Sequence, residues 1–249
     1  MKRIILCLLL GVGGASFLSA QEIELGDPQM LLVRERQWDI YGVIHTNGFG
    51  IGGRFGKIHN IHLESGFDFE YTYYRHFKEK SYLNAQNNNF SVFGKLAYMA
   101  QLRAGYGLTR IIASKPYFGG VEVGYFFYGG VSVALLIPVY LEVFDFSADK
   151  IVKIRASEDL YENGNISIQR RLSMFEKTKG TMLHPGAYLK TGLSFDFSRN
   201  DGLILKLDLG AAADIYPIPI KKMAFSPAQY VLLTGYLSFH IGKKLTIYE

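Results

Sequence analysis

The sequence predicts an all-β fold, an eight-stranded antiparallel up-and-down transmembrane β-barrel. Three observations predict it. Hydrophobic and polar residues alternate with a period of two through most of the chain after Arg36, as they do in strands that have one apolar and one polar face. Short turns alternate with long loops, as in bacterial outer-membrane barrels. Glycines and charges of both signs gather on the polar face, which suits the crowded interior of a narrow barrel.

Composition excludes several other classes of protein. The chain has 249 residues, of which 49% are hydrophobic, 14% aromatic and 20% charged, so it is not a disordered chain. No run of 18 apolar residues follows the first twenty, which excludes a transmembrane helix in that part. The single Cys excludes a disulfide framework and a multi-cysteine zinc site. The net charge of +5 is too small to indicate nucleic-acid binding.

The first twenty residues have the three parts of a secretory signal peptide. Lys2-Arg3 forms a basic start, residues 4–10 are apolar, and Ser19-Ala20 offers a cleavage site of small residues. We therefore expect a signal peptide at 1–20, a periplasmic N-terminal segment at 21–36 and a barrel at 37–249.

Alternation places the strands near residues 38–46, 49–57, 61–74, 90–110, 119–143, 185–198, 202–216 and 229–242. The first two strands meet at Asn47-Gly48, because a two-residue turn there keeps Ile44 and Phe49 on the apolar face and His45 on the polar face. In the third strand Phe67, Phe69 and Tyr71 face away from Asp68 and Glu70.

The fourth strand places Leu96 and Tyr98 opposite Lys95 and Arg103. We interpret the fifth strand as continuous through Gly129-Gly130, because a turn there would move Val131 to the face of Glu122. At about 3.3 Å per residue this strand is longer than a bilayer is thick, so its end should project into water. The last three strands repeat the alternation, as in Leu205 and Leu207 against Lys206.

The loops give the orientation. Short turns at 57–60, 111–118 and 199–201 are expected in the periplasm together with both termini, and long loops at 75–89, 144–184 and 217–228 are expected outside. Alternation alone does not separate a membrane barrel from a soluble one, but tyrosines near the strand ends of the apolar face favour the membrane. A short helix is expected around Ile168–Lys177.

An eight-stranded barrel has an interior that side chains fill, so a wide pore is not expected. Buried charges have to be paired, and we expect luminal ion pairs among Arg54, Glu64, Asp68, Glu70, Lys95, Arg103, Glu122, Lys190, Lys206, Asp208 and Asp214.

The motifs give no catalytic, cofactor or metal site. His59 and His62 have H-x-x-H spacing, but on a strand this spacing places the two rings on opposite faces. His240 lies beside Ser238 on the luminal face, with no placed acid and no G-x-S-x-G turn. We therefore expect no cofactor and no enzyme activity.

Loop 144–184 is the predicted partner-binding region, since long loops on a rigid scaffold concentrate binding residues. Its first half is acidic and its second half basic, and the candidate residues are Glu158, Asp159, Tyr161, Arg170, Arg171 and Lys177. The expected partners are outer-membrane lipid and proteins bound through this loop or through segment 21–36, and nucleic acid is not expected.

Several stretches resemble an outer-membrane β-barrel family of the Bacteroidota. They are 32–36 (LVRER), 45–50 (HTNGFG), 54–57 (RFGK), 103–107 (RAGYG), 138–142 (PVYLE) and 237–244 (LSFHIGKK). The resemblance implies an accessory barrel of an envelope machine, such as the outer-membrane protein assembly complex, and it brings no catalytic motif. The C-terminus departs from the usual aromatic ending, so the insertion signal is expected inward, at Phe239.

The sequence therefore predicts a scaffold or accessory subunit of an envelope protein complex in the bacterial outer membrane. Two alternatives stay open, a small lipid-modifying enzyme and a narrow channel. An enzyme would place a Ser/His/acid group at one mouth of the barrel, and a channel would need a continuous water path.

Overall fold

The computed structural model describes residues 34–60, 62–75, 79, 81–84, 89–92, 94–115, 120–145, 150–159, 167–171, 180–199 and 202–247. The predicted signal peptide and most of segment 21–36 lie outside these residues, as do Tyr161 and Lys177 of the predicted partner-binding set.

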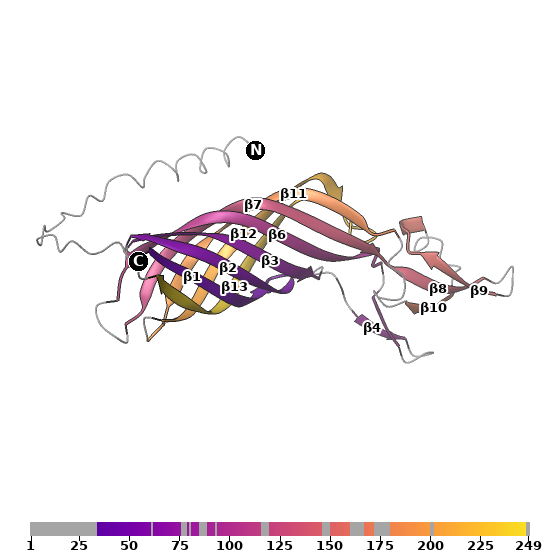
Figure 1. The fold of residues 1–249 in the computed structure, drawn as a ribbon. Coiled ribbons are helices and arrows are strands. Elements are labelled where there is room, and N and C mark those ends of the chain that lie inside the picture. Colours follow the sequence, from indigo (N-terminus) through magenta and orange to yellow (C-terminus); the bar gives the residue numbers. More distant parts are fainter. Residues whose placement is uncertain are drawn as a thin grey trace, which may run out of the picture. The chain divides into compact units, whose positions relative to one another are not determined.

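Eight antiparallel strands close into a barrel, which confirms the predicted fold (Figure 1). Around the ring the order is β1-β13-β12-β11-β7-β6-β3-β2, so the first and last strands of the chain pair and close the wall. The strands are β1 (Arg34–His45), β2 (Gly48–Asn60), β3 (Leu63–Tyr74), β6 (Ala97–Ala113), β7 (Glu122–Pro138), β11 (Met182–Asp196), β12 (Leu203–Ile220) and β13 (Gln229–Ile247).

The first hairpin is confirmed, but its turn lies one residue earlier than predicted, at Thr46-Asn47. His45 pairs with Gly48 and Ile44 with Phe49. This register differs from the predicted one by two positions, and a shift of two leaves every side chain on the same face. Gly48 is required here because a Cβ would lie 1.9 Å from the carbonyl oxygen of Tyr73.

The fourth barrel strand starts at Ala97 and not at residue 90. Residues 89–92 instead form β5 (Asn89–Val92), which pairs with β4 (Ser81–Asn84) in a separate two-stranded sheet. Gly94, with φ of 75°, interrupts the extended chain between β5 and β6, and glycine adopts this conformation without steric cost.

The fifth strand runs through Gly129-Gly130 as predicted, but it ends at Pro138 and not near Val143. The chain continues through Val139 into β8 (Tyr140–Asp145), which pairs with β9 (Lys150–Arg155) and β10 (Ser167–Arg171) in a second sheet. The helix predicted around Ile168–Lys177 is wrong over residues 168–171, because they belong to β10, which pairs with β8. Residues 172–179 lie outside the described part.

Pairing of Arg34 with Ile247 places both ends of the barrel wall at one end of the barrel, and β1 starts three residues before the predicted position 37. The connections 75–96, 139–181 and 221–228 lie at the opposite end, which we name the loop mouth, together with the tight turn of the first hairpin. Residues 139–181, which contain β8, β9 and β10, are named the β8–β10 insert.

The outer wall of the barrel is apolar. Large hydrophobic side chains on every strand point away from the lumen, among them Ile40, Phe69 and Leu233, which are 61%, 49% and 73% exposed. A contiguous apolar surface of this kind suits a lipid environment and not water. Within the part of the chain that the structure describes, no helix is long and apolar enough to cross a membrane.

Candidate functional site

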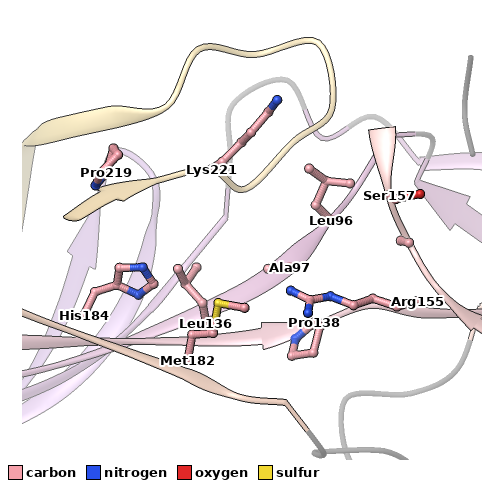
Figure 2. Close-up of a pocket in the computed structure, with 11 residues that line it drawn as sticks. Leu96, Ala97, Leu136, Pro138, Arg155, Ser157, Met182, His184, Pro219 and Lys221 are labelled. Atoms are coloured by element: carbon pink, nitrogen blue, oxygen red, sulfur yellow. The ribbon is translucent and has the colours of Figure 1, made fainter. Parts of the chain in front are cut away.

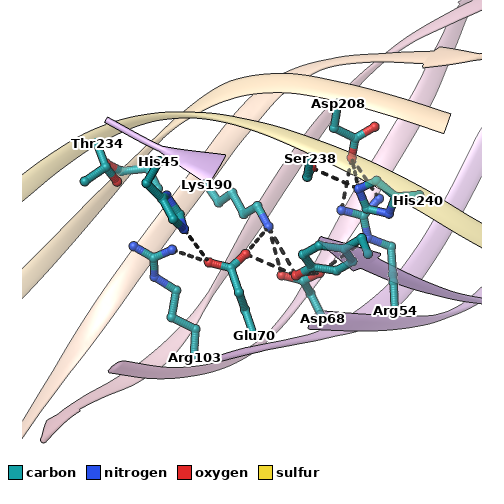
Figure 3. A network of polar contacts seen from close by, with 12 residues as sticks. His45, Arg54, Asp68, Glu70, Arg103, Lys190, Asp208, Thr234, Ser238 and His240 are labelled. Atoms are coloured by element: carbon teal, nitrogen blue, oxygen red, sulfur yellow. Dashed lines mark hydrogen bonds and ion pairs between the residues drawn. The ribbon is translucent and has the colours of Figure 1, made fainter. Parts of the chain in front are cut away.

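The centre of the lumen is held by Glu70 of β3 (Figure 3). One carboxylate oxygen accepts a hydrogen bond from Lys190 Nζ of β11 at 2.6 Å, and the other accepts from Arg103 Nη1 of β6 at 2.5 Å. Asp68, two residues earlier, lies 3.4 Å from the same Lys190 ammonium and accepts the Tyr41 hydroxyl at 2.9 Å. Alternation on β3 therefore places two carboxylates on the luminal face, where cations from other strands reach them.

Towards the loop mouth, Arg103 also binds Asp214 of β12. Its Nε and Nη2 donate to the two carboxylate oxygens at 3.0 and 2.6 Å. The Gln101 amide donates to the same carboxylate at 2.5 Å and to the Tyr216 hydroxyl at 2.6 Å. A bidentate guanidinium–carboxylate pair has fixed geometry, so it defines the distance between two strands that are not neighbours.

Towards the other end, Arg54 of β2 lies 3.2 Å from Asp208 and 3.5 Å from Asp68. Its guanidinium also lies over the Tyr128 ring, 4.5 Å from the centroid. Such stacking stabilises a desolvated cation.

A second group near the same end contains Lys206 and Glu64, which are 3.2 Å apart. The Gln37 amide donates to the same Glu64 oxygen at 2.7 Å.

Nine of the eleven predicted luminal residues lie in these buried ion pairs: Arg54, Glu64, Asp68, Glu70, Arg103, Lys190, Lys206, Asp208 and Asp214. Lys95 is not among them, because it precedes β6 and binds Glu79 at 2.7 Å near the loop mouth. Glu122 is half-buried at the start of β7 and forms no ion pair with any residue that the structure describes.

The sequence interpretation missed one group in the lumen. His240 Nε2 lies 3.0 Å from Ser238 Oγ, and His240 Nδ1 lies 2.6 Å from Asp39 Oδ1. The expectation that no acid accompanies this pair is therefore wrong. Asp39 is 201 positions away in the chain and reaches His240 only because β1 closes on β13.

This group resembles a Ser/His/Asp triad in its distances, but its surroundings differ from those of a nucleophile. His240 Nε2 also lies 3.1 Å from Asp208, so Asp208 and Ser238 compete for this nitrogen. The general base of a triad directs its Nε2 at the nucleophile alone. Ser238 is 1% exposed and His240 0%, and both lie in the middle of β13 and not at a mouth.

In the H-x-x-H motif, the first histidine contacts the neighbouring strand. His59 Nε2 lies 2.6 Å from Ser65 Oγ of β3. No group of three or more His, Cys, Asp or Glu side chains within the described ranges has the arrangement of a metal site.

The predicted partner-binding residues fall in different places. Glu158 accepts hydrogen bonds from the Lys221 ammonium and, at 3.0 Å, from the Phe225 backbone N–H. These donors hold the pKa of the Glu158 carboxyl below its usual value. Glu158 thus ties the β8–β10 insert to the loop between β12 and β13, whereas Asp159 is exposed. Arg170 and Arg171 lie at the end of β10.

The start of the β8–β10 insert is also bonded to the chain before β6, because the Val139 N–H donates to the Leu96 carbonyl at 2.9 Å. Within the insert, the Ala156 N–H donates to the Val139 carbonyl at 2.9 Å. Buried Val139, Leu141, Val143, Ala156 and Ala224 form a small hydrophobic core beside these bonds. The insert is therefore a packed platform, with a core that it shares with Ala224 of the loop between β12 and β13.

Strand β9 forms one edge of that platform, because among the described strands it pairs with β8 alone. Lys150 is exposed, and Ile151 and Val152 are 61% and 40% exposed. Lys153 lies 3.3 Å from Glu142 and keeps half of its side chain in solvent.

Comparisons with known proteins give structural likeness without sequence likeness. No protein-family model matches the chain, and no curated protein matches it significantly. Solved structures that resemble it include Neisserial surface protein A, with 12% identity, a TM-score of 0.40 and coverage of 86% of this chain and 97% of that chain. Ail, the attachment invasion locus protein of Yersinia pestis, in complex with the heparin analogue sucrose octasulfate, has 8% identity, a TM-score of 0.39 and coverage of 86% and 99%. The outer membrane protein OprG from Pseudomonas aeruginosa has 10% identity, a TM-score of 0.31 and coverage of 86% and 95%.

Proposed function

We propose that this protein is an outer-membrane β-barrel scaffold that recruits a protein partner to an envelope complex through the β8–β10 insert. The observation that carries the proposal is the contrast between the lumen of the barrel and the β8–β10 insert. The lumen is occupied by paired charges that bridge opposite walls, whereas the insert is a packed platform in which no other described strand pairs with the outer edge of β9.

The filled lumen argues against transport as the main function. Glu70, Arg103, Lys190 and Asp214 each have side chains that are at most 1% exposed. Opening a path between them would separate buried ions, and leaving a buried charge without its partner costs about 3–5 kcal/mol. The same pairs instead hold the wall at a fixed diameter, which a rigid support for an external platform requires.

The edge of β9 supports a partner of definite chemistry. An unpaired strand edge offers backbone N–H and C=O groups for strand addition. The exposed Ile151 and Val152 offer apolar contacts, and Lys150 offers a positive charge. Lysine on an edge strand disfavours pairing with a second copy of the same edge. An extended acidic segment of another protein is therefore the occupant that we propose.

Chain topology supports one orientation in the membrane. Both ends of the barrel wall lie together, opposite the loop mouth, and long loops of outer-membrane barrels face the exterior. We infer that the termini lie in the periplasm and the insert outside. The resemblance of the sequence to a Bacteroidota barrel family supports a place in the outer-membrane protein assembly complex as the more specific form of this proposal.

Site-specific photocrosslinking in cells tests the docking edge. A benzophenone amino acid at Ile151 should crosslink a partner, and the same group at Leu189, an exposed residue of the apolar wall, should not. The partner is identified by mass spectrometry, and its crosslinked peptide should be acidic. Crosslinking from Leu189 alone would move the docking surface to the barrel wall and contradict the proposal.

A charge-reversal pair provides the matched control. Lys150→Glu with Lys153→Glu should remove the crosslink from Ile151, because the acidic segment would then meet negative charges. Lys57→Glu with Lys243→Glu makes the same charge change on exposed residues at the opposite end of the barrel, and it should leave the crosslink unchanged. Equal loss in both variants would show a dependence on net charge and not on the edge.

A further inference from the structure

A cavity of about 400 Å³ lies at the loop mouth, between the barrel wall and the β8–β10 insert (Figure 2). The chain turn that follows β9, at Arg155, Ala156 and Ser157, forms one side of it. Strands β6, β7, β11 and β12 form the rest, together with Leu96 just before β6 and Lys221 just after β12. Its volume is within the range of small-molecule sites, about 300–1,000 Å³.

The side formed by the insert is held in place on both flanks. The Ala156 N–H donates to the Val139 carbonyl at 2.9 Å, and Glu158 is bound by Lys221 and by the Phe225 backbone. The cavity is therefore bounded by hydrogen-bonded backbone, and its shape does not depend on a free loop.

His184 contributes a buried polar group to the cavity. This residue of β11 is 7% exposed, and its Nδ1 has no hydrogen-bond partner among the residues that the structure describes. A buried nitrogen without a partner costs free energy that a ligand hydrogen bond recovers. His184 lines the cavity together with Leu136 and Met182 (Figure 2).

The charged residues of the cavity leave one net positive charge. Arg155 and Lys221 both line it. The ion pair with Glu158 balances Lys221, whereas Arg155 forms no ion pair within the described ranges. A guanidinium binds a planar carboxylate through two parallel hydrogen bonds, so the charge balance fits one carboxylate group.

Apart from Ser157, the remaining lining is apolar, and it consists of Leu96, Ala97, Leu136, Pro138, Ala156, Met182 and Pro219. Such walls accept a flat or aliphatic body and offer few hydrogen bonds to a sugar or a peptide. From the single uncompensated cation, the unpartnered imidazole nitrogen and the apolar walls, we propose that this cavity binds a small water-soluble carboxylic acid with an apolar body. Arg155 and His184 bind the carboxylate, and the apolar walls contact the body.

This inference goes beyond the proposed scaffold function, because it concerns a small ligand and not the protein partner. The probe is 2-naphthoate, with the neutral isostere 2-naphthamide as its control. The full protein is placed in nanodiscs of zwitterionic phosphatidylcholine, and binding is measured by calorimetry and by the shift of the His184 ring signals in NMR. We expect 2-naphthoate to bind and to shift these signals, and 2-naphthamide to bind at least about tenfold more weakly, as expected for loss of a charge-assisted hydrogen bond.

Two variants make the test specific. Arg155→Gln should weaken 2-naphthoate binding by about tenfold or more. The control Lys150→Gln removes the same charge from the other end of β9. Its affinity for 2-naphthoate should stay within about twofold of that of the unmodified protein. Equal affinity for the acid and the amide, or equal binding by Arg155→Gln and the unmodified protein, would overturn the proposal.

A lipid headgroup is the competing source of an anion at this position. Nanodiscs that contain phosphatidylglycerol distinguish it from a soluble acid. Unchanged 2-naphthoate affinity in these discs supports the soluble acid as the occupant. Loss of 2-naphthoate binding in them would overturn this assignment in favour of an anionic lipid.

Discussion

Arg103 and Asp214 form a bidentate ion pair across the lumen, with Nη2 of the guanidinium 2.6 Å from Oδ2 and Nε 3.0 Å from Oδ1. Their strands, β6 and β12, are not neighbours in the ring. The pair thus connects opposite parts of the wall, and Glu70 on β3 extends it through the second side of the guanidinium. Such contacts brace the wall from within, whereas the number of strands and their stagger set the diameter of the barrel.

Removal of Arg103 should therefore destabilise the barrel strongly. Arg103→Met leaves the buried Asp214 carboxylate without a cation, and the free energy of unfolding should fall by about 3–5 kcal/mol. Urea titration in lipid vesicles measures this change. Arg110→Met is the matched control, because Arg110 is on the same strand and is exposed. A loss of less than about 1 kcal/mol, the value of a surface pair, would show that Arg103 is not buried as described.

Arginine substitutions test whether the apolar outer face of the barrel meets lipid. Phe69→Arg and Leu233→Arg place a guanidinium on the apolar wall, and either should reduce the free energy of folding into a bilayer by about 2–4 kcal/mol near its midplane. Phe69→Leu keeps the face apolar and should fold normally. Heat-modifiable migration on gels reports the folded fraction. Normal folding of both arginine variants would mean that the apolar face does not meet lipid.

Lys222, in the loop between β12 and β13, gives a pH-dependent contribution to stability. Burial lowers the pKa of its ammonium from 10.5 to about 8, although Glu79 opposes the shift. Between these two values the unfolded chain keeps a proton that the folded chain has released, so stability rises with pH. The full contribution is about 3 kcal/mol.

The unfolding free energy of the unmodified protein, relative to that of Lys222→Met, should therefore increase from pH 8 to pH 10. Below about pH 8 the ammonium is charged in both states, and the difference should be constant. Urea titrations at a series of pH values measure it. A difference that stays flat up to pH 10 would show that the Lys222 amine is solvated.

Ser238 should not act as a nucleophile despite its distance of 3.0 Å from His240 Nε2. It is 1% exposed, and Asp208 competes for the same ring nitrogen. A fluorophosphonate probe should leave the folded protein unlabelled, and Ser238→Ala should cost only about 1 kcal/mol in stability, the value of one hydrogen bond. Labelling that disappears in Ser238→Ala would instead establish the enzyme alternative.

Alternation predicted the faces of the strands correctly because side-chain direction depends only on parity. The first hairpin shows this, since its turn moved but Ile44 and Phe49 kept their face. Alternation did not predict the break at Gly94. This residue has a positive φ and ends the extended chain, so Lys95 lies outside the barrel strand. Local periodicity predicts a helix at residues 168–171 because it does not show that this segment pairs with β8.

The sequence predicted which residues face the lumen, but not which of them contact one another. Residues of the luminal face follow from the pattern, but the contact of Asp39 with His240 joins positions 201 apart and depends on closure of the ring. The cavity at the loop mouth depends on how the turn after β9 lies beside β7 and β11, a position held by the contacts of Glu158 with the loop between β12 and β13. No motif in the sequence marks such packing.

The central claim is that the barrel is a rigid support for the β8–β10 insert and that the insert binds the protein partner. It is tested most directly by replacing residues 148–180 with a short Gly/Ser linker and measuring partner co-purification together with heat-modifiable migration. The barrel should stay folded, because changes in loop length contribute little to stability and the luminal ion pairs lie outside the replaced segment. The co-purifying partner should be lost. A shortened protein that is folded and retains its partner would contradict the account and place the recruiting surface elsewhere on the chain.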